Sequence, residues 1–259
     1  MPIITLTTDF GNDDPFDGVI KGVILNICPQ ANIVDLTDNI SPQDIYQANF
    51  LLDSCYQYFP KKTIHVCVVD PGVGTKRRPI LIQTKGYFFI GPDNGVFTSI
   101  IKKEKNIKII ELTEKKYWLK NVSQTFHGRD IFSPVAAHLA SGVNVKNFGK
   151  SINKENLVKL QTTKPIKNKN RITGIIQYID HFGNLITNIP NDFTYKKLTG
   201  KVKDIDFQGL VWCFALGNSK KLTAIHGSSG FIELFINKGN AAKITGIKTR
   251  DKVDVKYNL

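Results

Sequence analysis

The stretch that decides the fold reads IITLTTDFGNDDPFDGVIKGVILNI and runs from residue 3 to residue 27. Its first six residues, IITLTT, have the β-branched composition of a strand, and they stop at Asp9. From Asp14 to Ile27 the apolar residues recur at helical spacing, which predicts a helix that begins on an acidic loop. A strand, a polar loop and a helix in this order are typical of an α/β domain.

The segments that follow repeat this alternation. NIVDLTD (32–38) predicts a second strand, residues 41–58 a second helix with Ser41 and Pro42 as its start signals, and TIHVCVVD (63–70) a third strand. The short connections indicate a largely parallel sheet. Further along, the sequence predicts a hairpin from PILIQT (79–84) and GYFFIG (86–91), a helix at 95–103, a strand at 108–113 and a helix at 130–140.

A change of style after residue 160 indicates a second domain. QTTKPIKNKNR (161–171) loses periodicity and gains charge, Pro and Asn, as a linker does. Short alternating runs follow, separated by glycine-containing or polar turns: 172–179, 185–189, 210–216, 221–227, 230–236 and 251–257. We therefore expect an α/β domain over residues 1–163 and an antiparallel β-barrel domain over residues 171–259.

Composition excludes several classes of protein. No apolar run approaches the roughly 20 residues of a membrane span, and Met1 leads directly into a strand, so we expect a cytoplasmic protein. Four cysteines lie singly in apolar stretches, which predicts reduced thiols and neither a zinc site nor a disulfide framework: Cys28, Cys55, Cys67 and Cys213. The histidines at 65, 138, 181 and 226 have no partner in the pattern and are interpreted as structural.

The net charge of +13 raises the hypothesis of a nucleic-acid partner. Residues 1–60, however, hold eight Asp, no Glu, one Lys and no Arg, a local charge of −7, and only five of the 35 basic residues are Arg. Readers of base sequence depend on Arg forks. We therefore expect no specific nucleic-acid partner, and non-specific attraction to polyanions stays as a minor alternative.

The first polar loop offers two carboxylates. Asp9 follows the first strand, where an acidic side chain can bind a ribose diol, although the GxGxxG phosphate loop is missing. One alternative is that Asp9 or Asp14 caps the following helix. Another is a divalent cation held by Asp9, Asp13, Asp14 and Asp17, which lack the calcium-loop spacing and any His partner, so we predict no metal site.

Two further polar segments, VVDPGVGTKRRP (68–79) and TFHGRDIFSP (125–134), supply Asp70, Arg77 and His127. The PGVG turn would return Arg77 beside Asp70 and hold its carboxylate ionised. Together with an imidazole, such a pair could bind and deprotonate water. Taken singly, Asp70 could cap a turn, Arg77 form a surface ion pair and His127 lie in the core. Arg129 and Asp130 are expected to pair with each other or to cap the helix.

Six ordered motifs, TTDFGNDDPFDGVIKG, VDPGVGTKRRPI, GPDNGV, FHGRDIFSPVAAHLA, IDHFGNLITN and GSSGFIELFINKGNAA, cover nearly the whole chain. In this order the sequence resembles the adenosine-forming S-adenosyl-L-methionine (SAM) hydrolases, also called SAM hydroxide adenosyltransferases, which are relatives of the fluorinase and chlorinase enzymes. The resemblance implies a homotrimer with SAM as substrate, no cofactor, and a pocket where the first domain of one subunit meets the second domain of a neighbour. It also implies a catalytic triad of Asp70, Arg77 and His127.

The same resemblance suggests the substrate contacts. It assigns Asp9 to the ribose and Asp14 to the methionine amine, and it places a further set around methionine and adenine: Asp180, Phe182, Asn184, Ser228, Ser229 and Lys238. Fluorinases differ from this pattern. They lack the Asp70 and His127 equivalents, have a Trp at the position of Gln43, and carry a long insertion in the hairpin that a tight turn closes here at residues 84–87.

We therefore expect attack of water or hydroxide on ribose C5′, giving adenosine and L-methionine. The sulfonium needs no metal or acid to leave, because its departure converts a cation into neutral methionine. The alternative is a protein that binds adenosine or SAM without turnover, which would use the same pocket.

Overall fold

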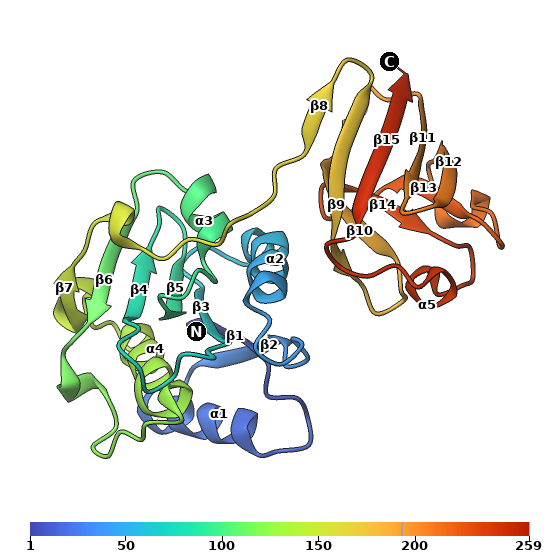
Figure 1. Cartoon of the computed structure of the whole chain (residues 1–259). Helices are drawn as coiled ribbons and strands as arrows, with labels where there is room; N and C mark the ends of the chain where they lie inside the picture. The colour runs from blue at the N-terminus through green and yellow to red at the C-terminus, as the bar shows by residue number, and fades with distance from the viewer. Residues whose placement is uncertain (193, 259) are drawn as a thin grey trace. The chain divides into compact units, whose positions relative to one another are not determined.

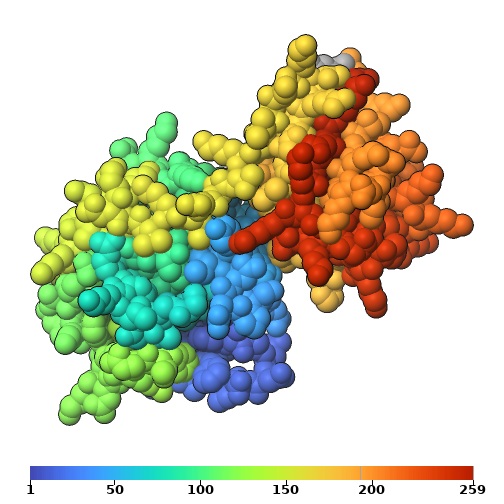
Figure 2. Space-filling view, viewed as in Figure 1, coloured from blue at the N-terminus to red at the C-terminus, as the bar shows by residue number. Residues whose placement is uncertain are grey.

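The computed structural model describes residues 1–192 and 194–258. The chain forms two compact units, Met1–Leu160 and Gln161–Leu259. Figure 1 shows that each unit is built on its own sheet, and Figure 2 shows the same view of the chain with all atoms drawn as spheres. No helix in the part of the chain that the structure describes is long and apolar enough to cross a membrane.

The first unit is built on a seven-stranded sheet in the order β2-β1-β3-β5-β4-β6-β7. The strands β1 (Ile3–Thr8), β2 (Asn32–Thr37), β3 (Ile64–Val68) and β5 (Phe88–Pro92) are parallel. The strands β4 (Pro79–Gln83), β6 (Lys108–Leu112) and β7 (Gly149–Ser151) extend the sheet in antiparallel fashion. The predicted α/β class is confirmed, as is the β4–β5 hairpin, whose turn is closed by Thr84 and Tyr87.

Helices cover both faces of this sheet, as the alternation within β3 requires. Ile64, Val66 and Val68 face the core that contains α1 (Phe16–Ile27) and α4 (Ser133–Ala140). Cys67, which points the other way, joins the core that contains α2 (Ile45–Cys55) and α3 (Thr98–Lys103). A strand buried on both faces is characteristic of a parallel sheet between two helical layers, and Figure 1 shows these layers.

The starts of all four helices predicted in this unit differ from the structure, and the third, predicted at 95–103, begins at Thr98. The first helix begins at Phe16, not Asp14, after Pro15 at the cap position. The second begins at Ile45, not Ser41, because Gln43 has a left-handed φ of 67° and Asp44 caps the helix by accepting from the Gln47 amide. In place of a single helix at 130–140, a π-turn at Gly128–Phe132 leads directly into α4.

The second unit is the predicted β-barrel. Seven strands close in the order β10-β14-β13-β12-β11-β15-β9, with β9 pairing back to β10, and β8 (Ile166–Asn168) extends from β9. Their bounds are β9 Arg171–Ile179, β10 Leu185–Pro190, β11 Lys197–Val202, β12 Ile205–Val211, β13 Leu222–His226, β14 Phe231–Phe235 and β15 Lys252–Asn258. Every pair is antiparallel except β12–β13.

The prediction of a strand at 210–216 is wrong beyond Val211, where β12 ends. Phe214–Leu216 forms a 3₁₀ turn instead, and the Trp212 side chain is 85% exposed. The prediction also missed β11 and the short helix α5 (Ala241–Thr245). In β11 only Leu198 and Val202 are buried, so its Lys and Gly residues conceal the alternation.

The cysteines and His65 have the structural roles that the sequence predicts. All four thiols are free; Cys28 and Cys67 are buried and the other two are half-buried. His65 is fully buried, stacks on Phe89 and hydrogen-bonds Thr5 at 2.8 Å from Nδ1 to Oγ1. Burial lowers the pKa of His65 to about 3, so its imidazole is neutral.

Candidate active site

The site lies where the strand order of the first unit changes direction. From β1 the chain crosses to β2 on one side and then returns to β3 on the other. Because Thr8 of β1 pairs with Val68 of parallel β3, the two strands end side by side. Asp9 and Asp70 therefore leave the sheet at neighbouring positions of its carboxyl edge, where open α/β sheets bind their ligands.

The turn after β3 returns Arg77 onto Asp70. Gly74 has a φ of 76°, and a Cβ there would lie 2.2 Å from the Gln124 carbonyl oxygen, so only glycine allows this close approach of the two loops. Arg77 Nε donates to both Asp70 oxygens at 2.9 and 2.8 Å, and Arg77 Nη2 donates to Asp70 Oδ2 as well. The two side chains are only 8% and 5% exposed, so this is a buried, charge-assisted pair and not a surface contact.

His127 completes the cluster from the loop before the π-turn. Its Nδ1 lies 2.9 Å from Arg77 Nη2. Because a guanidinium can only donate, Nδ1 must be the acceptor, which places the proton of the neutral ring on Nε2. Burial and the Arg77 charge lower the pKa of His127, against smaller opposing effects of Asp70, Asp130 and the Ser123 backbone. The imidazole is therefore neutral at pH 7.

Arg77 Nη1 is buried and has no hydrogen-bond partner among the described residues. The other guanidinium nitrogens are engaged with Asp70 and His127, and the Phe132 ring lies 5.1 Å from the guanidinium carbon. A buried donor without an acceptor costs free energy. Because this nitrogen is enclosed, it is not exposed to a nucleophile here, and the observed contacts of Arg77 fix Asp70 and His127.

The carboxylates of the first loop have different surroundings. Asp9 Oδ2 accepts from the Gln43 amide at 2.8 Å, while Asp14 is exposed. Neither caps α1, because the cap residue is Pro15 and the helix has no side-chain cap. The capping alternative for these two residues is therefore wrong.

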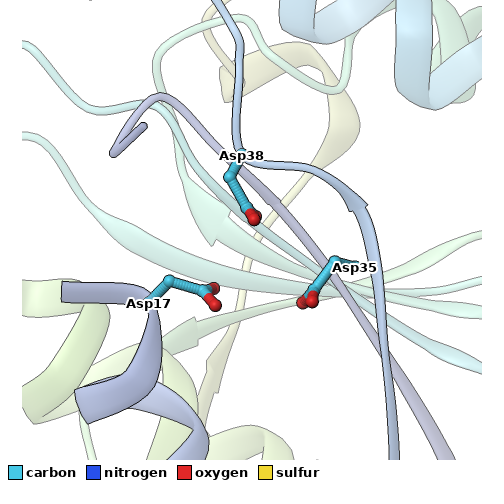
Figure 3. A group of neighbouring side chains, drawn as sticks. All are labelled: Asp17, Asp35 and Asp38. Atoms are coloured by element: carbon cyan, nitrogen blue, oxygen red, sulfur yellow. The ribbon is translucent and has the colours of Figure 1, made fainter. Parts of the chain in front are cut away.

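The carboxylates that lie close enough to share a cation are not the four in the first loop that the sequence suggested. Within the described ranges only Asp17, Asp35 and Asp38 bring carboxylate oxygens close enough to share an ion, and Figure 3 shows them converging from α1, β2 and the loop that follows. The Lys21 ammonium already pairs with Asp17 and, at 2.6 Å, with Asp35. Burial and the two neighbouring carboxylates raise the pKa of Asp38. The Lys21 ammonium group therefore already compensates the negative charge of these carboxylates.

In the second unit the predicted residues form two groups. Asp180 accepts from the Asn184 amide and side chain at 2.8 and 2.9 Å, and the Gly183 carbonyl accepts from Ala242, so this loop packs against the segment just after Lys238. Phe182 is 73% exposed. Ser228 and Ser229 lie in the β13–β14 turn, beside the far end of β10. The two groups therefore lie near opposite ends of β10.

Two features near His127 were not assigned from the sequence. The first is Ser123, whose amide donates to Asp130 and whose Oγ accepts from the Phe126 amide. The second is a cluster of three rings, Phe10, Phe16 and Phe126, with centroids 5.4–5.7 Å apart. In the sequence, each of these rings lies one or two residues from Asp9, Asp14 or His127. This adjacency of aromatic and polar residues is the signal from which the ring cluster could have been predicted. The predicted pairing of Arg129 with Asp130 is confirmed.

The fold and the site together define a two-unit protein with an α/β unit, a β-barrel unit, and a buried Asp–Arg pair joined to a half-buried His. The sequence profile of the SAM hydroxide adenosyltransferase N-terminal domain matches residues 4–149, and that of the C-terminal domain matches residues 174–254. The chain belongs to this family.

Relatives agree with this assignment. The (R)-S-adenosyl-L-methionine hydrolase of Methanocaldococcus jannaschii is 34% identical over 99% of this chain and 97% of its own length, and that of Salinispora tropica is 31% identical over 98% and 97%. A fluorinase of Actinoplanes is 28% identical over 73% of this chain and 72% of its own length. The crystal structure of an uncharacterized conserved protein from Thermotoga maritima is similar with a TM-score of 0.91 and 32% identity, covering 98% and 99% of the two chains.

Proposed function

We propose that the protein hydrolyses SAM to adenosine and L-methionine. The observation that carries this proposal is the Asp70–Arg77–His127 cluster, which joins a buried ion pair to a half-buried imidazole at the same sheet edge as the predicted ribose ligand Asp9. The cluster occurs in a chain that is similar over nearly its whole length to hydrolases of this substrate. A halide is not the expected nucleophile, because the cluster provides groups that hold and deprotonate water.

The reaction is a displacement at carbon. The oxygen of water or hydroxide bonds to ribose C5′ as the C5′–S bond breaks, and the bonding electrons stay on sulfur, which leaves as the neutral thioether of methionine. We propose that Arg77 fixes Asp70 and His127, that the His127 Nε2–H group and the Asp70 carboxylate orient the nucleophile, and that this carboxylate receives the proton when water attacks. Alignment of this kind can supply roughly 7–11 kcal/mol. The leaving group needs no further help, so we propose that no cofactor is required.

Substrate contacts extend from the same loops. We propose that Asp9 binds the ribose diol and Asp14 the methionine amine. Asn184 and its loop, with Lys238, would bind one end of the substrate, and the turn of Ser228 and Ser229 the other. The separation of these two groups along β10 supports an extended ligand.

We also propose a homotrimer that acts in the cytoplasm. The predicted ribose and triad residues belong to the first unit, and the remaining contacts belong to the second. If neighbouring subunits share the pocket, ligand stabilises the assembled state by mass action. Activity per subunit is therefore expected to fall when dilution dissociates the trimer. Light scattering and rate measurements over one dilution series test this, and a fully active monomer would contradict it.

The pH dependence of turnover should reflect His127. Because burial and Arg77 lower its pKa from 6.5, the neutral ring persists in mildly acidic solution. We expect the turnover of saturated enzyme to stay level from pH 8 to about 6.5 and to fall only below that value, as the imidazole gains a proton. A pH–rate profile with its acid limb above 7 would contradict this assignment.

The direct test is to incubate the purified protein with SAM and to separate the products by chromatography. Equal amounts of adenosine and L-methionine are expected, with oxygen from ¹⁸O-labelled water in the adenosine 5′-hydroxyl. Tight binding of SAM without product would favour the non-catalytic alternative. A steep salt dependence of DNA or RNA affinity, with no SAM binding, would instead favour a polyanion partner.

A further inference from the structure

Behind His127 lies a second polar network that the proposed chemistry does not use. The Asp130 side chain is completely buried. Its Oδ2 accepts from the Ser123 amide at 2.7 Å and from Arg129 Nη2 at 3.1 Å, and its Oδ1 accepts from Arg129 Nε at 2.6 Å. The carboxylate thus binds both ends of the loop that carries His127.

This loop is fixed from the inside as well. Ser123 Oγ accepts from the Phe126 amide at 3.0 Å, and the Phe126 carbonyl accepts from the Asp130 amide at 3.1 Å. The Arg129 guanidinium lies 5.2 Å from the centroid of the Phe126 ring. His127 lies within this loop, between Phe126 and Arg129, whose positions these contacts fix. The segment that Asp130 holds therefore carries His127 to Arg77.

We propose that Asp130 is a positioning residue for the reaction: by holding the Ser123 amide and the Arg129 side chain, it fixes the loop in the conformation that presents His127 Nδ1 to Arg77. This inference rests on the proposed function for its catalytic meaning, but its structural content does not. Outer groups of this kind orient a functional imidazole, as the outer partners of metal-bound histidines do.

Three charged groups face His127. They are Arg77 and Asp70 from the turn after β3 and Asp130 from the π-turn. Burial alone would raise the pKa of Asp130, but the bonds from Arg129 and Ser123 outweigh it and lower that pKa, so Asp130 stays ionised. Its negative charge raises the pKa of His127, against the effects of burial and Arg77.

Two variants should therefore shift the His127 titration in opposite directions. Asp130→Asn removes the charge at nearly constant shape, so the pKa of His127 should fall. Arg129→Met leaves the Asp130 charge less compensated, so the pKa of His127 should rise. Because the loss of Arg129 leaves the buried Asp130 carboxylate without its cation, the unfolding temperature of this variant is measured as well. These shifts test whether the Asp130 charge acts on His127, and the effect of Asp130→Asn on kcat and KM tests the positioning role.

Asp93→Asn is the matched control. Asp93 is also buried, accepts from Arg78 and accepts from the Val158 amide at 2.9 Å, but it does not appear among the charges that act on His127. Its replacement should lower the unfolding temperature to an extent similar to Asp130→Asn and leave the His127 titration unchanged.

The measurement is ¹⁵N NMR of histidine-labelled protein, with His127 assigned by comparison with His127→Gln, together with kcat and KM for SAM. We expect Asp130→Asn to lower kcat by up to about 10²-fold with little change in KM. A wild-type kcat in Asp130→Asn, with the wild type active, would overturn the positioning role alone. Absence of turnover in the wild type would overturn the proposed function, while the NMR shifts would still test the network.

Discussion

His127→Ala and Asp70→Ala are each expected to lower the turnover of SAM by at least about 10²-fold while the substrate still binds. The reason is the division of tasks in the site. Within the cluster, Asp70 and His127 contact only Arg77. The hydrogen bonds of these two side chains hold none of the residues that we expect to bind adenosine. Their loss should therefore affect the alignment and deprotonation of the nucleophile more than the affinity for the nucleoside.

Stability must be separated from chemistry in this experiment. Asp70→Ala leaves the Arg77 charge buried without its partner, which can cost about 3–5 kcal/mol. Asp70→Asn keeps the shape and an acceptor oxygen, and it should lower turnover without unfolding the protein. His138→Ala is the matched control for His127→Ala, because His138 is half-buried on α4 and contacts Tyr117, outside the cluster. Turnover at the wild-type rate in both Asp70→Ala and His127→Ala would exclude the triad.

Much of the first unit could be predicted from the sequence because its signals are local. The strand composition that stops at Asp9 and at Asp70 places both carboxylates at one edge once β1 and β3 are parallel neighbours. The PGVG turn likewise indicates the return of Arg77. These inferences need only the length of a strand, the conformation of glycine and the pairing of adjacent strands.

What could not be predicted depends on contacts between distant segments. The left-handed φ of Gln43 shortens the second helix and points its amide at Asp9, 34 residues earlier in the chain. The π-turn at Gly128–Phe132 forms where the loop carrying His127 packs on Val68, and a Cβ at Gly128 would lie 2.9 Å from Val68 Cγ1. That Arg77 Nη1 has no partner among the described residues becomes visible only when its neighbours are placed. No periodicity in the sequence encodes such contacts.

Asp9→Ala is expected to weaken the binding of adenosine and of SAM alike, because the ribose diol is common to both. Hydrogen bonds to a charged group contribute about 1.5–3 kcal/mol each. Loss of the carboxylate should therefore raise the Kd of both ligands by roughly 10²-fold or more. Isothermal calorimetry with each ligand gives the two values directly, and Asp13→Ala, a change of an exposed carboxylate in the same loop, is the matched control.

The Gln43 contact makes a second variant necessary. Asp9 also accepts from the Gln43 amide, so removal of its side chain could loosen the loop without touching a ligand. Asp9→Asn can keep that acceptor, but its amide cannot accept the hydrogen bonds of both diol hydroxyls. If Asp9 binds the diol, Asp9→Asn should weaken adenosine binding almost as much as Asp9→Ala. If adenosine binds Asp9→Asn with wild-type affinity, then Asp9 serves to anchor Gln43, and the ribose is held by other residues.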